Sequence, residues 1–349
     1  MALNKADLLD DRAKSILHDV VYSYIVKAQP VSSRAVAKQF DISAATIRNV
    51  LADLDDWGFL HQPHTSAGRV PTAEGYHAFI DLLKKDTALP RDQQVYIEKN
   101  LEEAGDSSDL AQVASHLLSQ LSHQAGVVLV PAPGDVILRS VDFVPLPGSK
   151  VLCVVVSSAG FVDNRVIDVD EILPREEYVR ISNYLTDNFA GLTLFEARDR
   201  LLRLMADERA QVDELMRRSI KLARQGFDVS PEPAVLVDGT EALLEQPEMA
   251  NVDRIRRLFE AFAEKAQLVS MLTKCVEGEG VRVLIGTDAA LTSELDFSLV
   301  ATHYGVAGNI LGSLGVFGPS RMEYPTLIPL VHFLGEAVSS ALAQSYARE

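Results

Sequence analysis

The order of strand-like and helix-like segments restricts the fold of this chain more than any other feature of its sequence. Apolar runs typical of β-strands occupy 126–130, 137–144, 150–157, 161–169, 234–237, 281–285, 298–304 and 310–316. Helical periodicity covers 110–122, 175–225, 252–273 and a final segment that begins near Leu327. One antiparallel sheet interrupted by a mostly helical insertion explains this order economically, because two unrelated domains would each be left with a small sheet. The predicted fold class is therefore α+β.

The first 85 residues follow a different pattern, in which short helices precede a hairpin. An apolar stripe runs through 10–29, Ser32 is placed to cap a short second helix, and Ser43 is placed to cap a third helix that Gly58 stops. Two strand-like pieces, 59–64 and 69–71, follow and are joined by a turn with a glycine placed for positive φ. This pattern is typical of a helix-turn-helix followed by a wing.

The third helix and the hairpin carry the candidate DNA contacts. At 100° per residue, Arg48 and Asn49 fall opposite the apolar face of the third helix, and Thr46 lies on its flank. Arg69 stands beside the glycine turn with His64, Thr65 and Ser66, a set suited to the phosphate backbone or a minor groove. A protein-interaction module is the alternative, since winged helices also serve that purpose.

Charge restricts where nucleic acid can be bound. The formal net charge is −16, but residues 1–90 hold 10 Lys and Arg against 11 Asp and Glu, while the remainder holds 23 against 38. Nucleic-acid binders are usually basic, so charge alone argues against this class. DNA contact is expected only at the N-terminal end, with Asp53, Asp55 and Asp56 far from the start of the third helix.

The remaining composition favours a cytoplasmic protein that is not an enzyme. The start of the chain has no basic and apolar leader, apolar runs such as 151–156 are too short to span a bilayer, and Cys153 and Cys275 have no paired spacing. The glycines at 305–318 match no phosphate-binding motif and are better explained by close packing. His61 and His64 lack a third ligand, so we expect neither a metal nor a cofactor.

Two long motifs resemble a known family. "SAATIRNVLADLDDWGFLHQPHTSAGRVPTAEGY" is similar to the signature of the heat-inducible transcription repressor HrcA family, and "LLEQPEM", "VRVLIGTD" and "LGVFGPSRMEYPTLIPLVHFLGEAVSSAL" agree with it in the correct order. The segment 175–245 is less distinctive. His77 departs from the family, in which a basic residue is common at this position.

The resemblance implies an N-terminal winged helix-turn-helix at 1–85 and a linker at 86–104. A GAF-like antiparallel-sheet domain would occupy 105–174 and 246–349, interrupted by a mostly helical inserted dimerisation domain at 175–245. It also implies a dimeric repressor of chaperone operons that binds an inverted-repeat operator and depends on the chaperonin GroEL. The implied DNA-binding residues are Ser43, Thr46, Arg48, Asn49, His64, Thr65, Ser66, Gly68 and Arg69. The alternative is a regulator that senses a small effector through its GAF-like domain.

Overall fold

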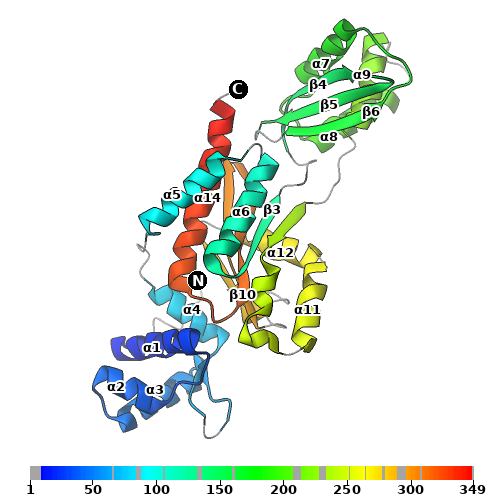
Figure 1. The fold of residues 1–349 in the computed structure, drawn as a ribbon. Helices are drawn as coiled ribbons and strands as arrows, with labels where there is room; N and C mark the ends of the chain where they lie inside the picture. The colour runs from blue at the N-terminus through cyan, green and yellow to red at the C-terminus, as the bar shows by residue number, and fades with distance from the viewer. Residues whose placement is uncertain are drawn as a thin grey trace.

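The chain forms three connected parts, shown in Figure 1 from blue at the N-terminus to red at the C-terminus. The computed structural model describes residues 9–347 except 65–66, 84–87, 105–106, 131, 133–135, 159–161, 207–213, 228–232, 251, 264, 277–279, 289–295 and 307–308. We call residues 9–83 the head, residues 136–227 the insertion unit, and the rest the body. The head and the insertion unit lie at opposite ends of the body (Figure 1).

The head is built from α1 (Asp11–Lys27), α2 (Ser33–Phe40), α3 (Ala44–Asp56), β1 (Leu60–His61), β2 (Val70–Pro71) and α4 (Ala73–Leu82). Each helix begins at a polar residue whose side chain accepts a hydrogen bond from the backbone N–H three residues on: Asp10, Ser32, Ser43 and Thr72. The expected caps at Ser32 and Ser43 are therefore confirmed. Apolar residues from all four helices are buried together, among them Leu17, Val36, Ile47 and Phe79.

Helix α3 ends as the sequence predicted, but the hairpin differs. Gly58 has φ of 85°, and the N–H of Phe59 donates to the carbonyl of Leu54 at 2.9 Å, which closes the last turn. The two strands are shorter than the expected 59–64 and 69–71. Val31 forms a β-bridge with Arg69 and so extends the hairpin on its other side. Gly68 does not have the positive φ expected of it. A Cβ there would lie 2.4 Å from the carbonyl oxygen of Val31, so glycine permits close strand approach instead.

The segment expected to be a linker, 86–104, contains a packed helix. Helix α5 (Arg91–Glu102) buries Ile97 and Leu101 in the same apolar cluster as α14 (Tyr324–Ala347), the last helix of the chain. The prediction of a mere connector is wrong. The many charged residues of this segment concealed one narrow apolar stripe.

The body is a five-stranded antiparallel sheet covered by helices on both faces. Its strand order is β7 (Ala234–Asp238), β3 (Ala125–Val130), β10 (Asn309–Pro319), β9 (Phe297–Val306) and β8 (Arg282–Ile285). Alternate residues, such as Val300 and Leu299, enter two separate apolar clusters. One cluster holds α6 (Ser107–Ser122) and α14, and the other holds α11 (Val252–Ala263) and α12 (Lys265–Val276). Short helices α10 (Thr240–Leu244), η3 (Pro247–Ala250) and η4 (Gly286–Asp288) join these elements.

The insertion unit has its own sheet, which corrects the expectation of a single sheet. Strands β4 (Leu138–Leu146), β5 (Lys150–Ser157) and β6 (Val162–Asp168) pair only with one another. Helices α7 (Arg175–Phe189), α8 (Leu194–Ala206) and α9 (Glu214–Gly226) share one apolar cluster with these strands. The boundary expected at residue 175 therefore falls inside this unit. Hydrophobic periodicity identifies a strand but not its pairing partner.

Helix α14 has the apolar composition of a membrane-spanning helix, but it packs in the core of the body. Tyr324–Gln344 is long and apolar enough to cross a membrane, contrary to the expectation that the apolar runs are too short. Leu330, Val331, Leu334 and Val338 of this helix are buried against the body sheet. The apolar composition of α14 is therefore explained by its place in the core.

Both cysteines are buried, one in each of two separate cores. Burial raises the pKa of the Cys153 thiol to about 12 and that of Cys275 to about 11. We predict that iodoacetamide at pH 8 labels both at least about 100-fold more slowly than a free cysteine, because the thiolate is the nucleophile and is scarce at that pH. Peptide mass spectrometry during heating would show whether the insertion unit, through Cys153, or the body, through Cys275, opens first. Labelling of the native protein at the free-thiol rate would contradict the buried placement.

Candidate nucleic-acid interface

The N-terminal turn of α3 is fixed by its own polar residues. The Ser43 hydroxyl accepts a hydrogen bond from the N–H of Thr46 at 3.1 Å, and the two hydroxyls lie 2.8 Å apart. Other backbone N–H groups of this turn have no intrahelical acceptor and carry the positive end of the helix dipole. The turn is therefore suited to a phosphate or to the edge of a base.

Arg48 and Asn49 lie on the solvent face of α3, as the helical wheel predicted. Both are exposed, whereas Ile47 and Leu51 beside them are buried in the head. A guanidinium and a carboxamide on one exposed helix face are the groups that bind guanine and adenine edges in a major groove. The structure thus brings Ser43, Thr46, Arg48 and Asn49 together along the first half of α3.

The hairpin of β1 and β2, which the sequence predicts to be a wing, is closed by short-range hydrogen bonds. The side-chain amide of Gln62 donates to the carbonyl of Ala67 at 2.9 Å, and the N–H of Ala67 donates to the carbonyl of His64 at 2.8 Å. His64 is exposed at this turn. Thr65 and Ser66, which were expected to contact DNA, lie outside the described residues.

Arg69 lies at the base of the wing rather than at its turn. Its guanidinium lies 3.1 Å from the Asp55 carboxylate in the last turn of α3, and the two side chains are 17% and 30% exposed. Its Nε is buried without a hydrogen-bond partner among the described residues. Asp55 is a functional candidate that the sequence reading missed, although the acidic run beside Trp57 was visible. A carboxylate at a helix C-terminus is unfavourable for the helix dipole, and Arg69 offsets it.

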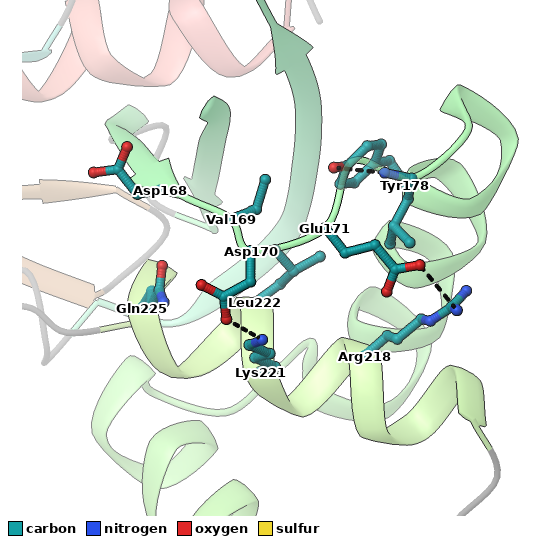
Figure 2. A pocket seen from close by; sticks show the side chains of 10 residues that line it. Asp168, Val169, Asp170, Glu171, Tyr178, Arg218, Lys221, Leu222 and Gln225 are labelled. Atoms are coloured by element: carbon teal, nitrogen blue, oxygen red, sulfur yellow. Dashed lines mark hydrogen bonds and ion pairs between the residues drawn. The ribbon is translucent and has the colours of Figure 1, made fainter. Parts of the chain in front are cut away.

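A second charged site, in the insertion unit, is too small to hold a metabolite. Figure 2 shows the turn after β6 against α9, where Lys221 bonds to Asp170 and Arg218 lies 3.8 Å from Glu171. Arg218 also bonds to Glu177 of α7. The cavity between them has a volume of about 50 Å³, whereas ligand pockets have about 300–1,000 Å³. These charges pair with one another and fasten the turn to α9.

A metal site is not found in the described part of the chain. No group of three or more His, Cys, Asp or Glu residues there is close enough to hold an ion. His61 and His64 lie on the hairpin, apart from any such group.

Comparison with known proteins decides the family. A family model described as the HrcA protein C terminal domain matches residues 108–328, more than half of the chain. The chain belongs to the HrcA family. A heat-inducible transcription repressor HrcA from Geobacter sulfurreducens is 39% identical over 96% of this chain and 98% of that protein. Another, from Xanthomonas campestris pv. campestris, is 36% identical over 98% of both chains.

HrcA membership gives the chain its function. HrcA relatives are heat-inducible transcription repressors, so this chain is a bacterial heat-shock repressor that binds DNA. A solved structure described as a hypothetical protein at 2.2 Å resolution is 23% identical, with a TM-score of 0.62 over 97% of this chain and 99% of that one. This likeness concerns the fold alone.

The Asp55–Arg69 pair allows a prediction in which the direction of the change in DNA affinity distinguishes two roles for Arg69. If Arg69 orients the wing through Asp55, Asp55→Asn weakens DNA binding by about fivefold, the equivalent of about 1 kcal/mol for a partly exposed pair. If Arg69 instead contacts phosphate and Asp55 merely opposes it, removing the carboxylate tightens binding. Fluorescence anisotropy on a HrcA operator fragment measures the change.

The control for this pair is Asp56→Asn, which removes the same charge from an exposed position in the same helical turn. We expect this control to keep or slightly raise the affinity. Arg69→Ala is expected to leave the slope of affinity against salt unchanged. A slope reduced by about one would show a phosphate contact and contradict the orienting role.

Proposed function

We propose that the head is a winged helix-turn-helix that reads one half-site of an inverted-repeat operator upstream of chaperone operons. The observation that carries the proposal is the exposed pair Arg48 and Asn49 on α3, directly after the capped turn at Ser43. The wing, with His64, Thr65, Ser66 and Gly68, follows the phosphate backbone beside the groove, and Arg69 supports its base. The repressor acts in the cytoplasm, and neither a cofactor nor an enzymatic activity is needed for this role.

The test of base reading is Arg48→Ala. A bidentate contact to guanine contributes about 1–3 kcal/mol, so this variant should lose affinity for its operator and discriminate less against mutated half-sites. Arg34→Ala is a matched control, because Arg34 begins α2, outside the reading face. Electrophoretic mobility shifts on specific and scrambled DNA measure the two effects. Equal losses on both DNAs would assign Arg48 to the backbone.

We also propose that the insertion unit joins two copies of the chain. Its helices bury only one face of its sheet. On the other face, Val144 and Val166, which are 45% and 55% exposed, flank the half-buried Leu152 of the central strand, and Val162, which is 41% exposed, pairs with the half-buried Val156. A contiguous apolar sheet face marks an association surface. An inverted repeat requires two heads related by a two-fold axis, so a second copy is the occupant proposed for it.

Val166→Glu tests the dimer. A carboxylate at the centre of an apolar interface would be desolvated without a partner, so this variant should sediment as a monomer and lose most operator affinity. Val179→Glu is the matched control, since Val179 is 51% exposed on α7, away from this sheet face. If Val166→Glu is still dimeric, the two copies associate elsewhere, and the exposed face of α11 is the next surface to test.

Control by GroEL is the third part of the proposal, and the chain topology supports it. In the body sheet, Val127 and Val128 pair with Gly315 and Leu314 across the whole insertion. Pairing between segments so distant in sequence is slow and leaves apolar strands exposed meanwhile. A chaperonin binds such a chain, and heat diverts the chaperonin to other clients.

The folding proposal predicts a steep dependence on the chaperonin. Denatured protein diluted without GroEL should recover only a minor fraction of operator binding, and GroEL with ATP should raise that fraction several-fold. GroEL without ATP is the control, because it captures the chain without releasing it. Nearly complete recovery without GroEL, with activity stable for hours at growth temperature, would contradict chaperonin control.

Effector binding is the alternative that one feature favours. A groove of about 690 Å³ lies between the end of the β9–β10 hairpin and α14, lined by His303, Asn309, His332 and Glu336 among others. Its size is that of a small-molecule site. A saturable rise in melting temperature with a metabolite, in the absence of GroEL, would favour this alternative.

A further inference from the structure

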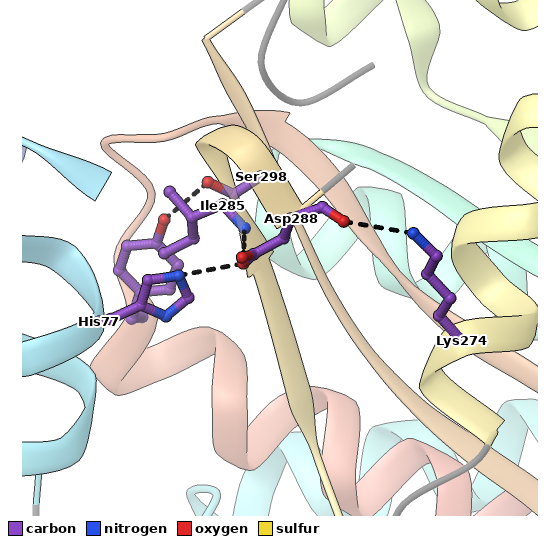
Figure 3. A network of polar contacts seen from close by, with 6 residues as sticks. His77, Lys274, Ile285, Asp288 and Ser298 are labelled. Atoms are coloured by element: carbon purple, nitrogen blue, oxygen red, sulfur yellow. Dashed lines mark hydrogen bonds and ion pairs between the residues drawn. The ribbon is translucent and has the colours of Figure 1, made fainter. Parts of the chain in front are cut away.

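The head is joined to the body by a small polar contact at α4. The Nε2 of His77 lies 3.0 Å from Asp288 Oδ2, and the two side chains are 36% and 34% exposed. The same Oδ2 accepts a hydrogen bond from the N–H of Ile285 at 2.8 Å, and the Asp288 carbonyl accepts one from the Lys274 ammonium at 3.3 Å. Figure 3 shows Asp288 between His77 of the head and Lys274 of α12. Asp288 therefore connects the head to β8 through its carboxylate and to α12 through its backbone carbonyl.

Close packing surrounds this polar contact. A Cβ on Gly286, which has φ of 57°, would lie 2.7 Å from the Cβ of Ala73 at the start of α4. Tyr76 stacks at a tilt on the buried Tyr324, with ring centroids 6.0 Å apart. Arg321 of the body donates to the carbonyl of Ile25 at 3.5 Å. The contact thus joins α4, and the end of α1, to the body.

Beside this contact the head and the body leave a cleft. A cavity of about 560 Å³ is lined by Tyr24, His61 and Pro63 of the head and by Asp296, Pro319 and Arg321 of the body. Because the cleft is open, few side chains on that side would obstruct a rotation of the head relative to the body. The direction in which α3 points therefore depends on the contacts that α4 and the end of α1 make with the body.

We propose that His77 and Asp288 are positioning residues that fix the angle of the head on the body, so that the two heads of a dimer meet two half-sites at once. The proposal rests on the proposed dimeric reading of an inverted repeat. The head and the insertion unit lie at opposite ends of the body (Figure 1). A small rotation at α4 therefore produces a large displacement between the two copies of α3. Neither residue contacts DNA in this scheme.

The proposal makes a specific prediction about bivalent binding. When both heads are held at the correct spacing, the second head binds at a high effective concentration, and loss of that geometry removes the gain. His77→Ala should weaken binding to the full operator by about tenfold or more, while binding to a single half-site stays unchanged. It should also broaden the range of half-site spacings that the protein accepts. His77→Gln, which retains a donor toward Asp288, should restore most of the loss.

The chain offers a matched control in a second histidine–aspartate pair. His116 of α6 lies 2.8 Å from Asp238 of β7, within the body and away from the head. His116→Ala removes the same kind of contact and should leave both DNA affinities unchanged. Thermal unfolding of the three variants shows whether each is folded, and His77 is exposed enough for Ala to be tolerated.

Three results overturn the inference. Equal losses on full operator and half-site would make His77 a DNA contact or a folding residue. No loss on either DNA would show that the contact does not set the angle. If the wild-type protein binds the full operator no more tightly than one half-site, the dimeric reading itself fails, and the inference fails with it. The wild-type measurement therefore separates failure of the proposed function from failure of the positioning role alone.

Discussion

The pairing of β3 with β10 is the interaction on which the rest of the structure depends. It joins residues 125–129 to residues 313–317 and so closes the body sheet across the insertion unit. The insertion unit leaves the sheet after β3 and returns at β7, which pairs with β3 on its other edge. The opposite edge of the sheet, at β8 and η4, holds α4 of the head. Loss of this one pairing would therefore disconnect the head from the insertion unit, even with each of them folded.

The charge distribution explains how an acidic protein can act on DNA. With a net charge of −16, most of the chain is repelled by a phosphate backbone. Helix α3, which carries the exposed Arg48 and Asn49, lies at one end of the molecule (Figure 1). Its acidic last turn is partly neutralised by Arg69. The acidic body and insertion unit lie away from that end. Repulsion then favours approach by the head, and nonspecific binding through other surfaces is disfavoured.

The apolar cluster shared by the head and the body differs from the cluster of the insertion unit in how it would respond to heat. The head and one face of the body share one apolar cluster, so the angle of the head depends on the integrity of the body. The insertion unit has a cluster of its own and folds around its own sheet. Pairing between segments distant in sequence, such as that of β3 with β10, forms slowly. Under the proposed chaperonin control, folding would act on the part of the molecule that connects the head to the insertion unit.

The sequence by itself determined the local structure and the family. The caps at Ser32 and Ser43, the stop at Gly58, the exposed face of Arg48 and Asn49, and most strands follow from short-range rules of capping and periodicity. Tertiary structure decided which strands share a sheet, because the pattern of a strand does not specify its pairing partner. Strands β4, β5 and β6 therefore form a sheet separate from that of the body. Tertiary structure also placed Arg69 beside Asp55 and His77 beside Asp288. It required glycine at position 68, because the backbone of Val31 approaches closely there. Each of these depends on contact between residues far apart along the chain, which residue spacing does not encode.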